Sequence, residues 1–170
     1  MESAVAKFET ARLLAQRLEE SDYADYQRLG QEPRVRAWLG GKLLTDGEVR
    51  QTLADSENHW QTHGFGIWTL RELASGAFVG RVGLRHCRVE GTPEVELLYT
   101  LLPEFWNRGF ATEVSREVLR IGLLVLQLPT IVAYTQPHNL ASRRVMEKCG
   151  LVYERPFTHA NLPHVLYRTP

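Results

Sequence analysis

The chain has 170 residues, of which 44% are hydrophobic and 24% charged, as is typical of one soluble globular domain with room for a core. Its 20 basic side chains balance its 20 acidic ones, and this argues against a general nucleic-acid binder, which needs a basic excess to neutralise phosphates. The longest apolar run, residues 123–126, is much too short to cross a bilayer, so we expect no membrane segment.

The first part of the chain predicts one strand and two helices. Residues 10–18 indicate an opening strand, and Ser21 or Asp22 can cap the helix that follows. Thr45 and Glu48 have the spacing of a capping box, which predicts a helix that runs to about residue 63.

The rest of the chain alternates strand and helix patterns. A helix expected over residues 112–126 carries an apolar stripe of Val114, Val118, Ile121 and Val125, which we expect to be buried. Another helix is expected over residues 139–148 and ends at Gly150. The expected strands cover residues 65–73, 77–87, 94–102, 131–135, 151–154 and 164–168. No repeat or linker divides the chain, so residues 1–170 are predicted to be a single α/β domain.

The turn after Pro103 combines a strand end with a helix start. Gly109 and Ala111 lack bulk, and the first N–H groups of a helix have no internal partner, so the backbone of residues 108–112 can form an anion cradle. Tight packing of small residues explains the same turn without a ligand.

Two further stretches carry polar groups of interest. Glu94 and Glu96 alternate onto one face of a strand, where a carboxylate is costly unless it is partnered, functional or solvated at a sheet edge. Asn139 can cap its helix, and Ser142 lies in the first turn. Each of these two residues can be purely structural or can face a ligand.

The two cysteines do not indicate a metal centre. Cys87 and Cys149 are far apart and match no metal-ligand spacing, and His86 beside Cys87 is best explained as a chance neighbour. We therefore predict no metal, and a reducing, cytoplasmic setting.

In order and spacing, these stretches resemble the GNAT acetyltransferase superfamily, and in particular its RimJ/RimL-like branch. The resemblance covers nearly the whole chain and rests on TARLL (10–14), ELLY (96–99), PEFWNRGFATE (103–113), NLAS (139–142) and EKCGL (147–151). Trp106 stands where the superfamily usually has Arg or Gln, and an aromatic residue there is common in this branch. The resemblance implies a mixed, mostly antiparallel sheet that is flanked by helices and splayed between its fourth and fifth strands.

The resemblance also implies acetyl-CoA as the cofactor and direct transfer to a primary amine. Glu96 would act as a water-mediated general base, and Ser142 would donate a proton to the CoA thiolate, because Val145 and Met146 cannot replace the tyrosine that many members carry on this helix. The residues implied to bind the cofactor are Leu101, Leu102, Asn107, Arg108, Gly109, Phe110, Ala111, Thr112, Asn139 and Ser142.

The acceptor amine is left open between a protein N-terminus and a small molecule. In the family it is set by the first two helices and the last hairpin, here residues 21–63 and 156–163, which carry Trp38, Trp60, Asp46 and Glu48. We expect no nucleic-acid or membrane partner, and a monomer or homodimer. The competing interpretations are a non-catalytic acyl-CoA-binding module and a purely structural domain.

Overall fold

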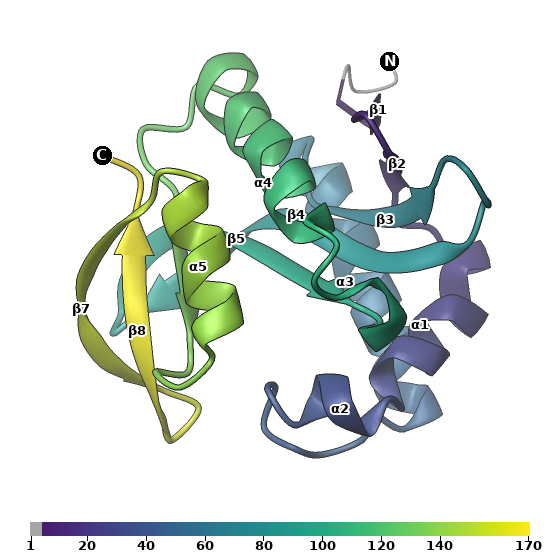
Figure 1. Cartoon of the computed structure of the whole chain (residues 1–170), viewed down its shortest axis with the longest axis horizontal. Helices are drawn as coiled ribbons and strands as arrows, with labels where there is room; N and C mark the ends of the chain where they lie inside the picture. The colour runs from purple at the N-terminus through teal and green to yellow at the C-terminus, as the bar shows by residue number, and fades with distance from the viewer. Residues whose placement is uncertain (1–4) are drawn as a thin grey trace.

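The computed structural model describes residues 5–170 as helices packed on one sheet (Figure 1). The helices are α1 (Tyr23–Gly30), α2 (Pro33–Arg36), α3 (Asp46–His63), α4 (Phe110–Arg120) and α5 (Leu140–Lys148). The strands are β1 (Lys7–Glu9), β2 (Leu13–Arg17), β3 (Ile67–Glu72), β4 (Phe78–Val89), β5 (Thr92–Leu101), β6 (Val132–Thr135), β7 (Val152–His159) and β8 (Leu162–Arg168). A π-helical turn, Ile121–Val125, extends α4.

The sheet has the order β1-β2-β3-β4-β5-β6-β8-β7, and every neighbouring pair is antiparallel except β5 and β6. This parallel pair has a single residue pair in register, Glu96 with Val132. Beyond Glu96 the two strands diverge, as the sequence implied. They are the fifth and sixth strands rather than the fourth and fifth, because the short β1 at the sheet edge was not predicted.

Helices cover both faces of the sheet. In Figure 1, α4 and α5 lie on the viewer's side and α3 lies behind. Helix α4 packs on β4 and β5 through the buried Phe110, Val114 and Val118. At Gly122 the approach is so close that a Cβ atom would lie 2.6 Å from Ile131, which explains the small residue there.

Local signals account for most helix ends. Thr45 accepts from the N–H of Glu48, and Glu48 accepts from the N–H of Thr45, so the expected capping box opens α3. Helix α3 ends at His63, and Gly64 follows with a φ of 74°. Asn139 caps α5 by accepting from the N–H of Ser142 at 3.2 Å.

Further expectations differ from the structure. The opening strand β2 begins at Leu13 and not at residue 10, and Asp22 stands at the start of α1 without a capping bond from its side chain. Val125 is 49% exposed instead of buried, because the π-helical turn changes the periodicity that would bury it. Helix α4 starts two residues earlier than expected, at Phe110. The last strand pair is longer than expected, because β7 extends to His159 and turns through Ala160 and Asn161, which both have positive φ.

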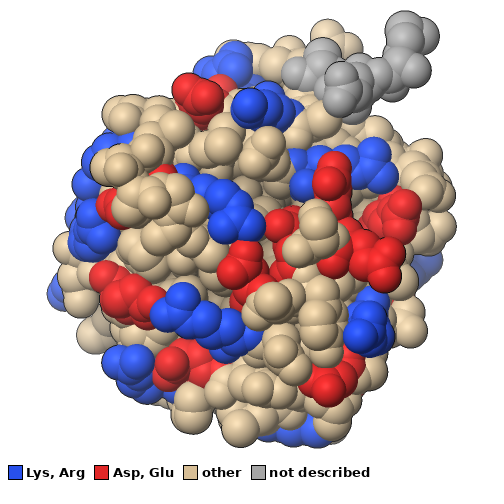
Figure 2. Space-filling model, turned by 90° about the vertical axis from the view of Figure 1, so that its right-hand side faces the viewer, with Lys and Arg blue, Asp and Glu red and all other residues tan. Residues whose placement is uncertain are grey.

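None of the helices in the described residues is long and apolar enough to cross a membrane. On the face shown in Figure 2, basic and acidic side chains are interspersed instead of gathered by sign. This distribution agrees with the zero net charge of the sequence.

Candidate active site

Glu96 lies at the point where β5 and β6 separate, and it is only 5% exposed. Arg85, opposite it on β4, pairs with its Oε2 atom at 2.9 Å. The Tyr134 hydroxyl on β6 donates to the same oxygen at 3.1 Å. Burial and the neighbouring carboxylate raise the pKa of Tyr134, so this hydroxyl keeps its proton.

The two oxygens of Glu96 have different surroundings. Oε2 accepts both hydrogen bonds, whereas Oε1 accepts none from the described residues and is not sealed from solvent. The carboxylate is therefore anchored through one oxygen and can meet a water molecule with the other. This is the arrangement that a water-mediated base requires.

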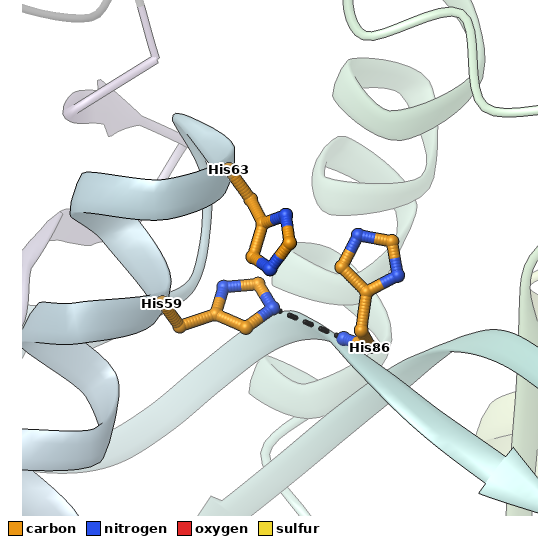
Figure 3. Close-up of side chains that lie close together, drawn as sticks. All are labelled: His59, His63 and His86. Atoms are coloured by element: carbon orange, nitrogen blue, oxygen red, sulfur yellow. Dashed lines mark hydrogen bonds between the residues drawn. The ribbon is translucent and has the colours of Figure 1, made fainter.

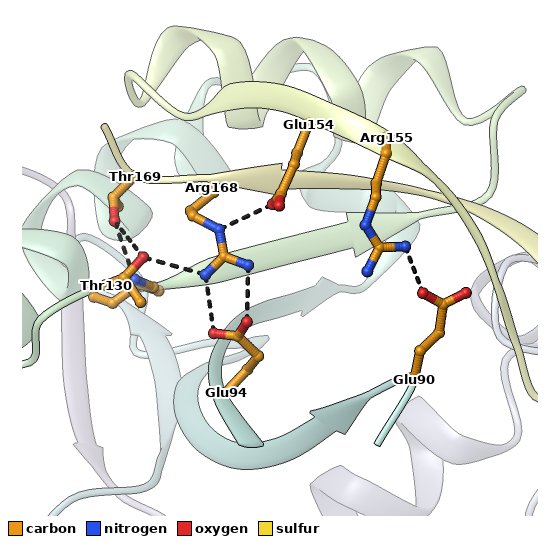
Figure 4. A network of polar contacts seen from close by, with 8 residues as sticks. Glu90, Glu94, Thr130, Glu154, Arg155, Arg168 and Thr169 are labelled. Atoms are coloured by element: carbon orange, nitrogen blue, oxygen red, sulfur yellow. Dashed lines mark hydrogen bonds and ion pairs between the residues drawn. The ribbon is translucent and has the colours of Figure 1, made fainter. Parts of the chain in front are cut away.

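Glu94, two residues earlier, has a structural role. Both of its oxygens accept from Arg168 on β8, at 2.8 and 3.0 Å (Figure 4). Arg168 also bonds Glu154 at 2.9 Å and so ties β5 to β7 and β8. Glu94 is therefore held at both of its oxygens by one guanidinium, whereas Glu96 is held at one oxygen alone.

The loop that enters α4 contains two residues with left-handed backbone conformation, Asn107 (φ 58°) and Gly109 (φ 77°). A Cβ atom at Gly109 would meet only the Arg12 guanidinium, at 3.4 Å. The backbone conformation, more than crowding, therefore calls for glycine at this position.

The same loop presents an unbroken row of backbone donors. The first hydrogen bond of α4 runs from the N–H of Glu113 to the carbonyl of Gly109, at 3.0 Å. Within the described chain, the N–H groups of residues 109–112 precede this first bond and have no partner in the helix. They stand at the positive end of the helix dipole, which is the environment that a phosphate needs.

The side chains around this loop fix its position. The Arg108 guanidinium pairs with Glu72 and lies 4.5 Å from the centre of the Phe110 ring. Arg12 pairs with Glu113 at 2.7 Å and lies 4.5 Å from the same ring. The Trp106 indole donates to the carbonyl of Leu101 at 2.8 Å, so this aromatic residue ties the loop to the end of β5.

On α5, Ser142 meets a partner that sequence reasoning missed. The Tyr99 hydroxyl lies 2.9 Å from the Ser142 Oγ and donates to the Ser142 carbonyl at 3.0 Å. Burial raises the pKa of Tyr99. Its position three residues after Glu96 on β5 indicated only that it faces the opposite side of the sheet. The contact with α5 depends on the fold.

Of the residues considered for acceptor binding, Trp38 alone borders the segment after β6. Its carbonyl accepts from Gln136 at 3.2 Å, and its ring lies 5.2 Å from that of His138. Trp60 is buried against Trp68, with the rings edge to face. The two acidic residues make contacts within the helical layer. Asp46 on α3 accepts a hydrogen bond from Gln27 on α1, and Glu48 completes the cap of α3.

Comparisons with known proteins identify the family of the chain. Residues 12–152 match the family described as "Acetyltransferase (GNAT) domain". The Bacillus subtilis protein YkkB is 26% identical over 97% of this chain and 96% of its own length. The FsC-acetyl coenzyme A-N(2)-transacetylase of Aspergillus fumigatus is 30% identical over 76% of this chain, which spans 58% of that relative. A spermidine N-acetyltransferase from Vibrio cholerae, solved with CoA and spermine, is 17% identical and has a TM-score of 0.72 over 92% of each chain.

Proposed function

The chain belongs to the GNAT acetyltransferase family, and on that premise we propose that it transfers acetyl from acetyl-CoA directly to a primary amine, with Glu96 as the base. The observation that carries this proposal is the free Oε1 atom of Glu96 at the point where β5 and β6 separate. An ammonium has no lone pair, so its proton must be removed before attack. A water molecule held by Oε1 can accept that proton.

The residues of this chain fit the two ends of CoA. The N–H groups of residues 109–112 would hold the pyrophosphate, and the backbone edges exposed where β5 and β6 part would hold the pantetheine arm. Leu101 and Leu102, at the end of β5, would line that gap, and Asn139 would bond an amide of the arm. When bound, acetyl-CoA supplies an activated acetyl thioester.

Ser142 would protonate the departing thiolate. Its hydroxyl lies 2.9 Å from that of Tyr99, whose single proton is donated to the Ser142 carbonyl. If that proton turned to the Ser142 Oγ, the serine proton would be free to go to the thiolate. Glu96 and Tyr99 point to opposite faces of β5, which keeps the proton-accepting group and the proton-donating pair apart on the two sides of the gap.

The acceptor is a small-molecule amine or a protein N-terminus. Proteins of similar fold include a spermidine N-acetyltransferase, which is named for a small-molecule amine, and a ribosomal L7/L12 α-N-protein acetyltransferase, which is named for a protein. We infer that Trp38 and the β7–β8 hairpin border the acceptor. The Trp38 carbonyl bonds Gln136, just after β6, and the hairpin is joined to β6 through β8.

A panel of amines tests the proposal. The purified chain is incubated with acetyl-CoA and polyamines, amino acids, aminoglycosides or short peptides, and the thiol released is measured together with the acetylated product. Burial raises the pKa of both Cys87 and Cys149 to about 11, so the protein's own thiols should add little background. Turnover with any amine supports an enzyme. CoA binding without thiol release across the panel would instead favour the non-catalytic binding module.

A further inference from the structure

Three histidine side chains gather where α3 ends beside β4 (Figure 3). His59 and His63 are four residues apart on α3 and therefore share one face of the helix, and His86 reaches them from β4. One ring nitrogen from each of the three lies within 4.8 Å of the other two. Sequence analysis predicted no metal and treated His86 as a chance neighbour of Cys87, because His86 is 23 residues beyond His63.

His59 is held as metal-binding histidines usually are. Its Nδ1 atom lies 2.7 Å from the carbonyl oxygen of Phe65, which fixes that nitrogen as the donor and leaves Nε2 with the lone pair. Nε2 accepts from the backbone N–H of His86 at 3.1 Å. The ring is thus oriented, with its basic nitrogen facing the other two histidines.

The surroundings of the cluster also suit a cation. His63 is the last residue of α3, where the helix dipole favours positive charge. The side chains of His63 and His86 are exposed.

We propose that His59, His63 and His86 bind one divalent transition-metal ion of the zinc class, with water as the fourth ligand. Three neutral imidazoles without a carboxylate suit zinc, nickel or cobalt and not magnesium or calcium, which prefer oxygen ligands. At Zn–N distances of about 2.0–2.1 Å the three nitrogens must approach one another to about 3.3 Å, which rotation of the two exposed rings can supply. His59 then exchanges its bond from the His86 N–H for the metal.

The site would stabilise the fold and take no part in acetyl transfer. Arg85, which holds Glu96, precedes His86 on β4, and successive strand residues point to opposite faces. A bound metal would join the end of α3 to β4 beyond Gly83, the last β4 residue that pairs with β3.

The test uses the whole chain, prepared without a polyhistidine tag and stripped with a chelator. Zn²⁺ is titrated by calorimetry, and Co²⁺ is added in a parallel experiment to look for the visible absorption of a four-coordinate site. The variants are His63→Gln and His63→Gln/His86→Gln. The matched control is His138→Gln, which changes an exposed histidine outside the cluster.

We expect the wild type and the His138 variant to bind one Zn²⁺ per chain and to melt at a higher temperature with it. Loss of one ligand should weaken binding at least about tenfold, since even second-shell changes cost 10–100-fold. If the wild type binds no Zn²⁺, or if the cluster variants bind it as tightly as the control, the site does not exist. Because the single variant alters an exposed residue at a helix end, it gives a result even if the double variant fails to fold. Zinc binding is measured without acetyl-CoA, so its outcome is independent of the proposed activity.

Discussion

Replacing Glu96 with Gln is the sharpest test of the proposed chemistry, because the change keeps the shape of the side chain and removes its basicity. A general base contributes about 10²–10⁴-fold in rate, which is roughly 2.7–5.4 kcal/mol of barrier. We expect turnover to fall by this range while the affinity for acetyl-CoA stays unchanged. The contacts of Oε2 with Arg85 and Tyr134 should survive in weakened form.

The stability cost can be bounded from the same contacts. Glu96 is buried, but the Arg85 side chain is 45% exposed, so solvent compensates part of the lost ion pair. Hydrogen bonds to charged groups are worth about 1.5–3 kcal/mol, and the amide retains some of this, which leaves a loss of about 1–2 kcal/mol. For a chain of this length that corresponds to a fall of roughly 2–8 °C in melting temperature.

Glu94→Gln is the matched control. It lies on the same strand and the same face, and its bidentate pair with Arg168 should make it at least as costly to stability. Its turnover should stay near that of the wild type. Thiol release is measured for both variants with the acceptor found in the amine panel, at several pH values. The Glu96 variant should recover partly at high pH, where more of the acceptor amine is already unprotonated.

Two results would refute this reasoning. If Glu96→Gln lowers turnover by much less than about a hundredfold, the smallest usual contribution of a general base, then Glu96 is not the base. If Glu94→Gln slows turnover as much as Glu96→Gln does, the loss in both reflects damage to the sheet and not proton transfer.

The other predictions concern the cofactor, the leaving group and pH. Gly109→Val and Gly150→Val both place a side chain at positive φ and should each cost about 1–3 kcal/mol, but in calorimetry only the Gly109 change should weaken CoA binding. Ser142→Ala and Tyr99→Phe should each slow thiol release by less than about 10²-fold and leave CoA affinity unchanged. If both variants turn over as fast as the wild type, the pair has a structural role only. Burial lowers the pKa of His59 below its usual 6.5, so the unfolded chain takes up this proton first. In the absence of metal the melting temperature should therefore fall as the pH drops below about 6.5, and His59→Asn should reduce this dependence.

Features that depend only on residues close together in the sequence could be predicted. The capping box at Thr45 and Glu48 could be predicted because it needs only its own spacing. The divergence of the sheet after Glu96 came from the family resemblance, because no local pattern distinguishes a strand that pairs throughout from one that separates midway. Residues 7–9 and 155–159 escaped because most of their side chains are polar or exposed, so the apolar alternation of a strand is missing.

The partners of the site residues could not be predicted, because each comes from a distant element. Glu94 and Glu96 have the same spacing and the same face, and what separates their roles is Arg168, which is 74 residues away from Glu94. Tyr99 meets Ser142 across 43 residues. A sequence pattern selects residue types and faces, whereas the choice between a structural and a chemical role depends on which oxygen atoms remain free after folding.

The placement of Glu96 follows from that last point. A buried carboxylate must be partnered, and Arg168 holds Glu94 through both of its oxygens. Glu96 is held through one oxygen, at the single register pair of β5 and β6. On one side, Arg85 and Tyr134 satisfy Oε2, and on the other, the strands have begun to part and leave Oε1 within reach of water.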